Sequence, residues 1–179
     1  MRVTDQIINE TARRAGVPVN MSLVDYLNKS QKDDFSDVFG TEASTNLAKK
    51  NSYEKLEKKA EELAKNAQAF LAEGQDSMFA KAKESGDYEE VYSQVEKLLD
   101  SYNATLKSLK GSSSTLDSYY SQMLKDAAGE NSEALKAAGI TIGKDGTLSI
   151  DKEKLKELDK ESLEKLFGPS GTFTEKIAF

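Results

Sequence analysis

A run of apolar residues between positions 88 and 109 constrains the fold of this chain more than any other feature. Its members, here called the apolar stripe, recur at steps of three or four residues: Tyr88, Val91, Val95, Leu98, Tyr102, Leu106 and Leu109. This spacing places side chains on one face of an α-helix, and so long a face requires a partner that covers it. We therefore expect a helix over residues 87–109 that packs against another helix.

A second periodic run predicts that partner. Apolar residues recur at the same steps between positions 51 and 73: Tyr53, Leu56, Ala60, Leu63, Ala67 and Phe70. Asn51 and Glu54 are a candidate capping pair at its start. Because the connection to the next helix is short, we expect the two helices to pack antiparallel, along Leu98 and Leu106. With 31% charged and 37% hydrophobic residues, the composition is typical of amphipathic helices with solvated outer faces.

The pattern changes after a further helix that Ser114 is expected to begin and Gly129 to end. Ile140 and Ile142 alternate with polar residues, Leu148 and Ile150 do so again, and the Asp145-Gly146 pair lies between the two runs. Asp and Gly tolerate the positive φ of a tight turn, so we predict a β-hairpin at 140–150. Asp151 and Asp159 are then expected to cap two short helices with their leucines turned inward.

These patterns predict a mainly α fold, an elongated antiparallel helical hairpin or coiled coil with a small β-hairpin and short helices at one end. Three regions are expected. Residues 1–50 form an N-terminal helical or irregular region, residues 51–129 form the long helical hairpin and the following helix, and residues 130–179 form a small α+β module.

The composition also excludes several kinds of catalytic, metal-binding and partner-binding site. The chain has no His and no Cys, which excludes Ser-His and Cys-His nucleophile pairs and the usual zinc sites. An EF-hand with Gly146 at its invariant glycine would need a glutamate where Lys152 stands, so calcium is not expected. The net charge of −6 disfavours nucleic acid, and no apolar run approaches the roughly 20 residues of a membrane span. We expect no catalytic residues, no cofactor or metal site, no small-molecule substrate, no nucleic-acid partner and no membrane insertion.

Two segments resemble a known family. They are VEKLLDSYNATLKSL, residues 95–109, and residues 134–171, which carry Gly139-Ile140, Asp145-Gly146-Thr147-Leu148-Ser149-Ile150-Asp151, Leu155 and Leu166-Phe167. The order and spacing of these residues, with the preceding Tyr102-Asn103 pair, are similar to the C-terminal half of the flagellar filament cap protein family, also called hook-associated protein 2. The large β-rich outer domains of that family have no counterpart here. The resemblance therefore implies a reduced relative or a fragment.

The resemblance implies which residues matter. The apolar stripe together with Asn103 is expected to serve packing or assembly. The hairpin module is expected to depend on residues in its strands, its turn and its last helix: Ile140, Asp145, Gly146, Leu148, Ile150, Asp151, Leu166 and Phe167.

The expected function follows from the same resemblance. It is that of a non-enzymatic structural protein of the bacterial flagellar axis, exported by the type III route without a cleaved signal to the extracellular flagellum. Such a protein would assemble with itself or with other flagellar axial proteins. The alternative is a cytoplasmic helical adaptor or a flagellar export chaperone. Apolar residues near both ends, among them Ile7, Phe35 and Phe173, further predict that residues 1–20 and 172–179 become ordered only on assembly.

Overall fold

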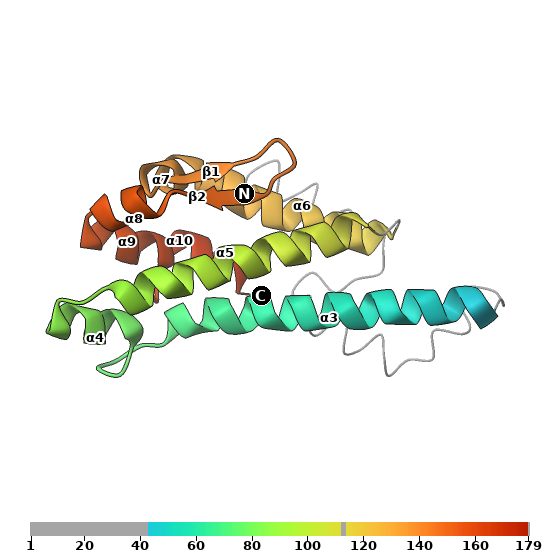
Figure 1. The fold of residues 1–179 in the computed structure, drawn as a ribbon, viewed down its shortest axis with the longest axis horizontal. Coiled ribbons are helices and arrows are strands. Elements are labelled where there is room, and N and C mark those ends of the chain that lie inside the picture. Colours follow the sequence, from blue (N-terminus) through green and yellow to red (C-terminus); the bar gives the residue numbers. More distant parts are fainter. Residues whose placement is uncertain (1–42, 112–113, 179) are drawn as a thin grey trace, which may run out of the picture.

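The structure is a computed structural model that describes residues 43–111 and 114–178, with side chains from residue 50 onward. Its elements, in chain order, are α3 (Ala43–Leu71), α4 (Met78–Ser85), α5 (Glu89–Lys110), α6 (Thr115–Glu130), α7 (Ser132–Ala137), β1 (Ile140–Ile142), β2 (Leu148–Ile150), α8 (Lys152–Glu157), α9 (Lys160–Phe167) and α10 (Thr172–Ile177) (Figure 1). The predicted mainly α fold with a small β-hairpin is confirmed. Most of the expected N-terminal region, including residues 1–20, lies outside the described residues.

Helices α3 and α5 pack side by side in opposite directions, as the two periodic runs predicted (Figure 1). The amide of Asn66 donates to the Lys97 carbonyl and to the Ser101 hydroxyl, at 3.2 Å each. The Thr105 hydroxyl donates to the Lys59 carbonyl over 2.9 Å. Later residues of α5 therefore meet earlier residues of α3, which defines an antiparallel pair.

The start of α3 differs from the prediction. The helix begins at Ala43, so Asn51 lies inside it and the proposed Asn51–Glu54 capping pair is wrong. The segment before Asn51 contains Ala, Leu and Lys, residues with high helix propensity. A favourable local propensity thus extends the helix beyond the point where the apolar periodicity starts.

Helix α5 packs on α3 and also on α6, the hairpin and α8, while α10 packs on α3, α6 and α9 (Figure 1). Every member of the apolar stripe is buried, and so are Tyr92 and Leu99 beside it. The hairpin module was expected at one end of the helical pair, but it lies along the side of α5. Lys156 of α8 pairs with Glu89 at the start of α5, and Lys110 at its end contacts Asp145 of the hairpin loop. Helix α5 therefore has a second buried face, which includes Tyr92 and Leu99, and the module packs against this helix rather than beyond its end.

The two strands pair antiparallel, with Ile140 opposite Ile150 and Ile142 opposite Leu148. The loop closes through hydrogen bonds from Gly143 to the Thr147 carbonyl and from Gly146 to the Gly143 carbonyl, at 2.7 and 2.9 Å. Gly146 has a φ of 86°, in the left-handed region that glycine adopts without strain. The predicted hairpin at 140–150 is confirmed, but of the Asp-Gly pair only Gly146 takes the positive φ.

Most of the predicted helix starts are also confirmed. The Ser114 hydroxyl accepts from Leu116 N, Asp151 accepts from Lys154 N and Asp159 accepts from Ser162 N. Each of these side chains satisfies a backbone donor that the first helical turn leaves open. Short polar residues therefore define where α6, α8 and α9 begin.

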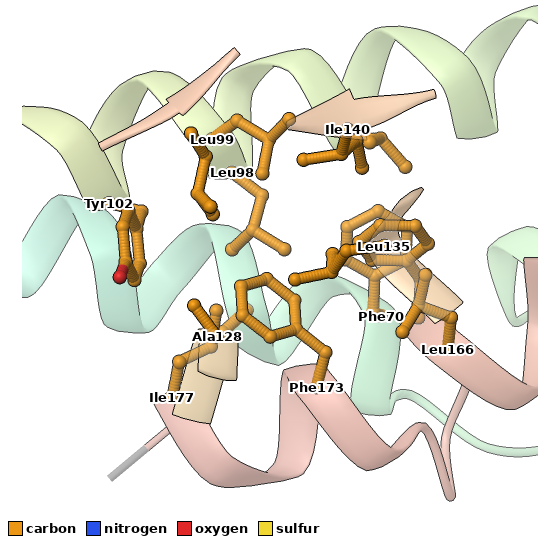
Figure 2. Packing of buried hydrophobic residues seen from close by; sticks show 14 of the residues in the cluster. Phe70, Leu98, Leu99, Tyr102, Ala128, Leu135, Ile140, Leu166, Phe173 and Ile177 are labelled. Atoms are coloured by element: carbon orange, nitrogen blue, oxygen red, sulfur yellow. The ribbon is translucent and has the colours of Figure 1, made fainter. Parts of the chain in front are cut away.

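One hydrophobic core joins the long helices to the C-terminal elements. Figure 2 shows side chains from α3, α5, α6, α7, β1, α9 and α10 converging on it. The Phe173 ring of α10 lies 6.1 Å from the Tyr102 ring and 6.1 Å from the Phe167 ring, measured between centroids. Phe173 is 0% exposed and Ile177 is 3% exposed. The expectation that residues 172–179 become ordered only on assembly is therefore wrong for α10, because its apolar side chains complete this core.

Candidate functional site

Two adjacent residues of α5 hold the β-hairpin. We call the contact of Tyr102 and Asn103 with residues 145–148 the hairpin junction. The Asn103 amide nitrogen donates to the Leu148 carbonyl over 2.7 Å, and the Leu148 N–H donates to the Asn103 side-chain oxygen over 2.7 Å. One side chain thus satisfies both backbone groups of a strand residue, as a third strand would do. This reciprocal pair fixes β2 against α5.

The Tyr102 side chain makes the second contact of the junction. Its hydroxyl donates to the Leu124 carbonyl over 2.9 Å and lies 3.2 Å from the Gly146 carbonyl, so it joins α6 and the hairpin loop. Burial raises the pKa of the phenol above its ordinary value of 10, and the negative charges of Asp126 and Asp145 add to this effect. The hydroxyl therefore remains protonated and able to donate at neutral pH.

Asp145 shapes the hairpin loop from within. Its carboxylate accepts from the Thr147 hydroxyl over 2.6 Å and from the Thr147 N–H over 3.1 Å. These two bonds, with the nearby Lys110 ammonium, lower the pKa of Asp145 from 3.8 to about 2. The Lys110 ammonium also contacts the Asp145 backbone carbonyl. The carboxylate is exposed, and its bonds are made within the loop that it stabilises.

Two glycines permit the close packing around the junction. A Cβ on Gly146 would lie 2.7 Å from Cγ of Lys125, which crosses the loop from α6. Gly139, with a φ of 77°, precedes β1, and a Cβ there would lie 2.9 Å from the Asp151 carbonyl oxygen. Any larger residue at either position would displace a neighbour and strain the backbone.

Ion pairs connect the helices that follow the hairpin to the rest of the fold. Lys152 and Lys156 of α8 pair with Glu96 and Glu89 of α5, at 2.8 Å each. The Lys160 ammonium of α9 lies 4.6 Å from the centroid of the Tyr88 ring and 4.9 Å from that of Tyr92. Because these cations are exposed, each contact is weak, but together they orient α8 and α9.

The structure brings together only part of the predicted set. Asp145, Gly146 and Leu148 meet Tyr102 and Asn103 at the hairpin junction. The remaining hairpin-module residues have other positions: Ile140, Leu166 and Phe167 lie in the core, Ile150 is half-buried and Asp151 caps α8.

Three residues that support the site were not predicted. They are Lys110, Lys125 and Thr147. Thr147 had a detectable signal, since an Asp followed two residues later by a hydroxyl residue commonly forms a local hydrogen-bonded turn. Lys110 and Lys125 had none, because their contacts depend on how α5 and α6 pack.

In residues 43–111 and 114–178, no three acidic side chains are grouped in a way that could hold a metal ion. Among the helices in the same ranges, none combines the length and apolar character that a membrane span requires.

Comparisons with known proteins add no relative. No protein-family model, no curated protein and no solved structure matches the chain.

Proposed function

We propose that this chain is a non-enzymatic structural protein of the bacterial flagellar axis, of the hook-associated class, which acts through protein–protein contacts. The observation that supports this proposal is the hairpin junction. The two segments that resemble the filament cap family meet there, and the contact joins Asn103 to Leu148, residues 45 positions apart. The two segments are separated in the sequence but are in contact in the fold, and this contact supports the resemblance more strongly than either segment does alone.

The chemistry of the junction supports a holding role. The lowered pKa of Asp145 and the raised pKa of Tyr102 both arise from contacts within the fold. Both side chains are occupied in fixing a loop to two helices. The proposed partners are therefore other polypeptides, either copies of this chain or other flagellar axial proteins.

We also propose how the protein leaves the cell and where it acts. The protein would leave the cell through the flagellar type III export channel, without a cleaved signal, and act at the extracellular flagellum. The alternative, a cytoplasmic adaptor or flagellar export chaperone, would remain inside the cell with its partner. This difference in location gives the simplest test.

The test is an export assay. A tagged chain is produced in a flagellated bacterium and in a matched strain whose flagellar export gate is deleted. We expect the chain in the culture medium, and in the sheared flagellar fraction, of the first strain alone. Retention of the chain inside both strains would contradict the axial proposal and favour the adaptor.

A pair of variants connects the assay to the junction. Asn103→Ala removes the contact with β2, whereas Lys107→Ala changes an exposed residue on the same helix. We expect both variants to reach the medium and only Asn103→Ala to lose binding to the flagellar fraction. Equal binding by the two variants would separate the junction from assembly.

A further inference from the structure

The exposed surface of the described chain offers little for apolar contact between copies. Between residues 50 and 178, leaving out 112 and 113, every Leu, Ile, Val, Phe, Tyr and Met side chain is buried or half-buried. Stable association between copies usually requires a well-packed apolar centre. The largest fully apolar side chains of this part of the chain lie in its core, so presenting them to a second copy would supply such a centre.

Helix α10 is the element best placed to do so. Phe173 and Thr174 are 0% exposed and Ile177 is 3% exposed, and the helix packs on α3, α6 and α9. Figure 2 shows Phe173 and Ile177 entering the core beside Ala128. The helix is connected to α9 only by residues 168–171. The site that receives it is thus formed largely by residues far away in the chain.

Polar contacts fix how α10 docks. The Thr172 hydroxyl donates to the Asn131 side-chain oxygen over 2.5 Å, at the corner between α6 and α7. The Lys176 ammonium pairs with the Glu130 carboxylate at the end of α6. These contacts make the site specific for α10 in one orientation, whichever copy of the chain provides it.

The connection itself contributes few contacts of its own. The Gly171 N–H donates to the Gly168 carbonyl over 2.7 Å, and the Thr174 hydroxyl donates to the Phe167 carbonyl over 3.1 Å. Opening this segment breaks the Gly171–Gly168 hydrogen bond. The contacts of α10 with α3, α6 and α9, including the Thr174–Phe167 bond, would re-form on a second copy. Exchange of an identical element is a low-cost route to dimers.

We infer that two copies of this chain associate by exchanging α10, each inserting Phe173 and Ile177 into the other's core. This inference rests on the self-assembly part of the proposed function and names the contact through which it occurs. Because the exchanged contacts already exist within one copy, association needs no new apolar surface.

A charge-reversal experiment tests the exchange. Glu130→Lys places two cations together and Lys176→Glu places two anions together, so each variant alone repels its own α10. In an exchanged dimer of one copy of each, both pairs are restored. We expect mixing to increase the dimer about tenfold over either variant alone, measured by analytical ultracentrifugation. The double variant with both changes in one chain is the matched control and should behave as the unmodified protein.

A covalent readout supplements this experiment. The chain contains no cysteine, so introduced thiols report a single contact. A mixture of Asn131→Cys and Thr172→Cys chains should form a disulfide-linked dimer. The same Thr172→Cys chain mixed with Ser93→Cys, an exposed position on α5, should not.

The results of these experiments distinguish a failure of α10 exchange from a failure of self-assembly as a whole. If the unmodified chain associates but the mixed variants give neither extra dimer nor a specific disulfide, exchange is wrong and another surface mediates assembly. If the unmodified chain remains monomeric at every concentration up to millimolar, exchange is wrong and the self-assembly part of the proposed function fails with it.

Discussion

The α3–α5 pair and the hairpin junction are held together in different ways. The helix pair combines many apolar side chains, among them Leu63, Leu98 and Leu106, so no single contact defines it. The junction depends on a few directed hydrogen bonds from Tyr102 and Asn103. A repeated pattern tolerates small changes at its members, whereas a contact made by one side chain is lost with that side chain.

The two regions also differ in how their alignment is specified. Along α3 and α5, apolar packing alone would permit several registers, and buried polar groups select one. Gln94 donates to the Asn66 carbonyl over 3.1 Å, and Asn66 donates in turn to Ser101. At the junction, the bonds that select the alignment are the same bonds that provide much of the attachment.

The largest expected effect tests the helix pair. Leu98→Asp would bury a carboxylate with no partner at a position that is 0% exposed. The cost is several kcal/mol against a total stability of roughly 5–15 kcal/mol, so we expect the protein to unfold. Thermal melting followed by circular dichroism measures this. The neighbouring exposed change Lys97→Asp should shift the melting temperature little, and an unaltered melting curve for Leu98→Asp would contradict the packing.

The next effect tests the entry into the hairpin. Gly139→Ala would force a positive φ on alanine and place its Cβ 2.6 Å from Cβ of Lys154. We expect a loss of about 2–4 kcal/mol in the free energy of unfolding, measured with urea. Gly129→Ala, in α6 and without a neighbour within 4 Å, should instead gain about 0.5–1 kcal/mol. A loss of the same size at both positions would remove the structural distinction between the two glycines.

A smaller and more local effect tests the junction. Asn103→Ala leaves the Leu148 N–H and carbonyl without their partners, which costs about 1–3 kcal/mol. We expect faster hydrogen exchange at the Leu148 amide, while amides in the middle of α3 keep their protection. Lys107→Ala is the control. If Leu148 remains as protected in Asn103→Ala as in the unmodified chain, Asn103 does not hold the hairpin.

The smallest effect concerns pH. The folded-state pKa of Asp145 is lowered from 3.8 to about 2, so its ionised form stabilises the fold above pH 4. That contribution is lost as the pH falls from about 4 to about 2. Asp145→Asn should melt slightly below the unmodified protein at pH 6, and the two should converge near pH 2. A gap that persists in acid would show that the carboxylate charge is not the cause.

The helices and the hairpin could be predicted from the sequence wherever they depend only on residues that are close together in the chain. Steps of three and four residues identified α3 and α5, the Asp145-Gly146 pair identified the turn, and Asp151 and Asp159 marked two helix starts. The start of α3 was missed, because residues 43–50 are helical but precede the apolar periodic run that begins at Tyr53. Local periodicity reports which face is buried, and it does not report how far a helix extends beyond that face.

The candidate site was predictable only in part. The resemblance implied that Tyr102, Asn103 and the Asp-Gly segment all matter, but their spacing in the sequence does not show that they are in contact. Lys110 and Lys125 could not be found, because their contacts exist only after α5, α6 and the hairpin pack together.

The sequence by itself determined that this protein is mainly helical, with one hairpin, because apolar period and turn chemistry act between residues that are close in the chain. Only the tertiary structure decided that α5 is covered on two faces, that Asn103 satisfies the backbone of Leu148, and that α10 completes the core. These contacts join residues far apart in the chain, such as Asn103 and Leu148 at a separation of 45 and Asn131 and Thr172 at a separation of 41. Each of them forms only when the whole core brings its two partners within bonding distance.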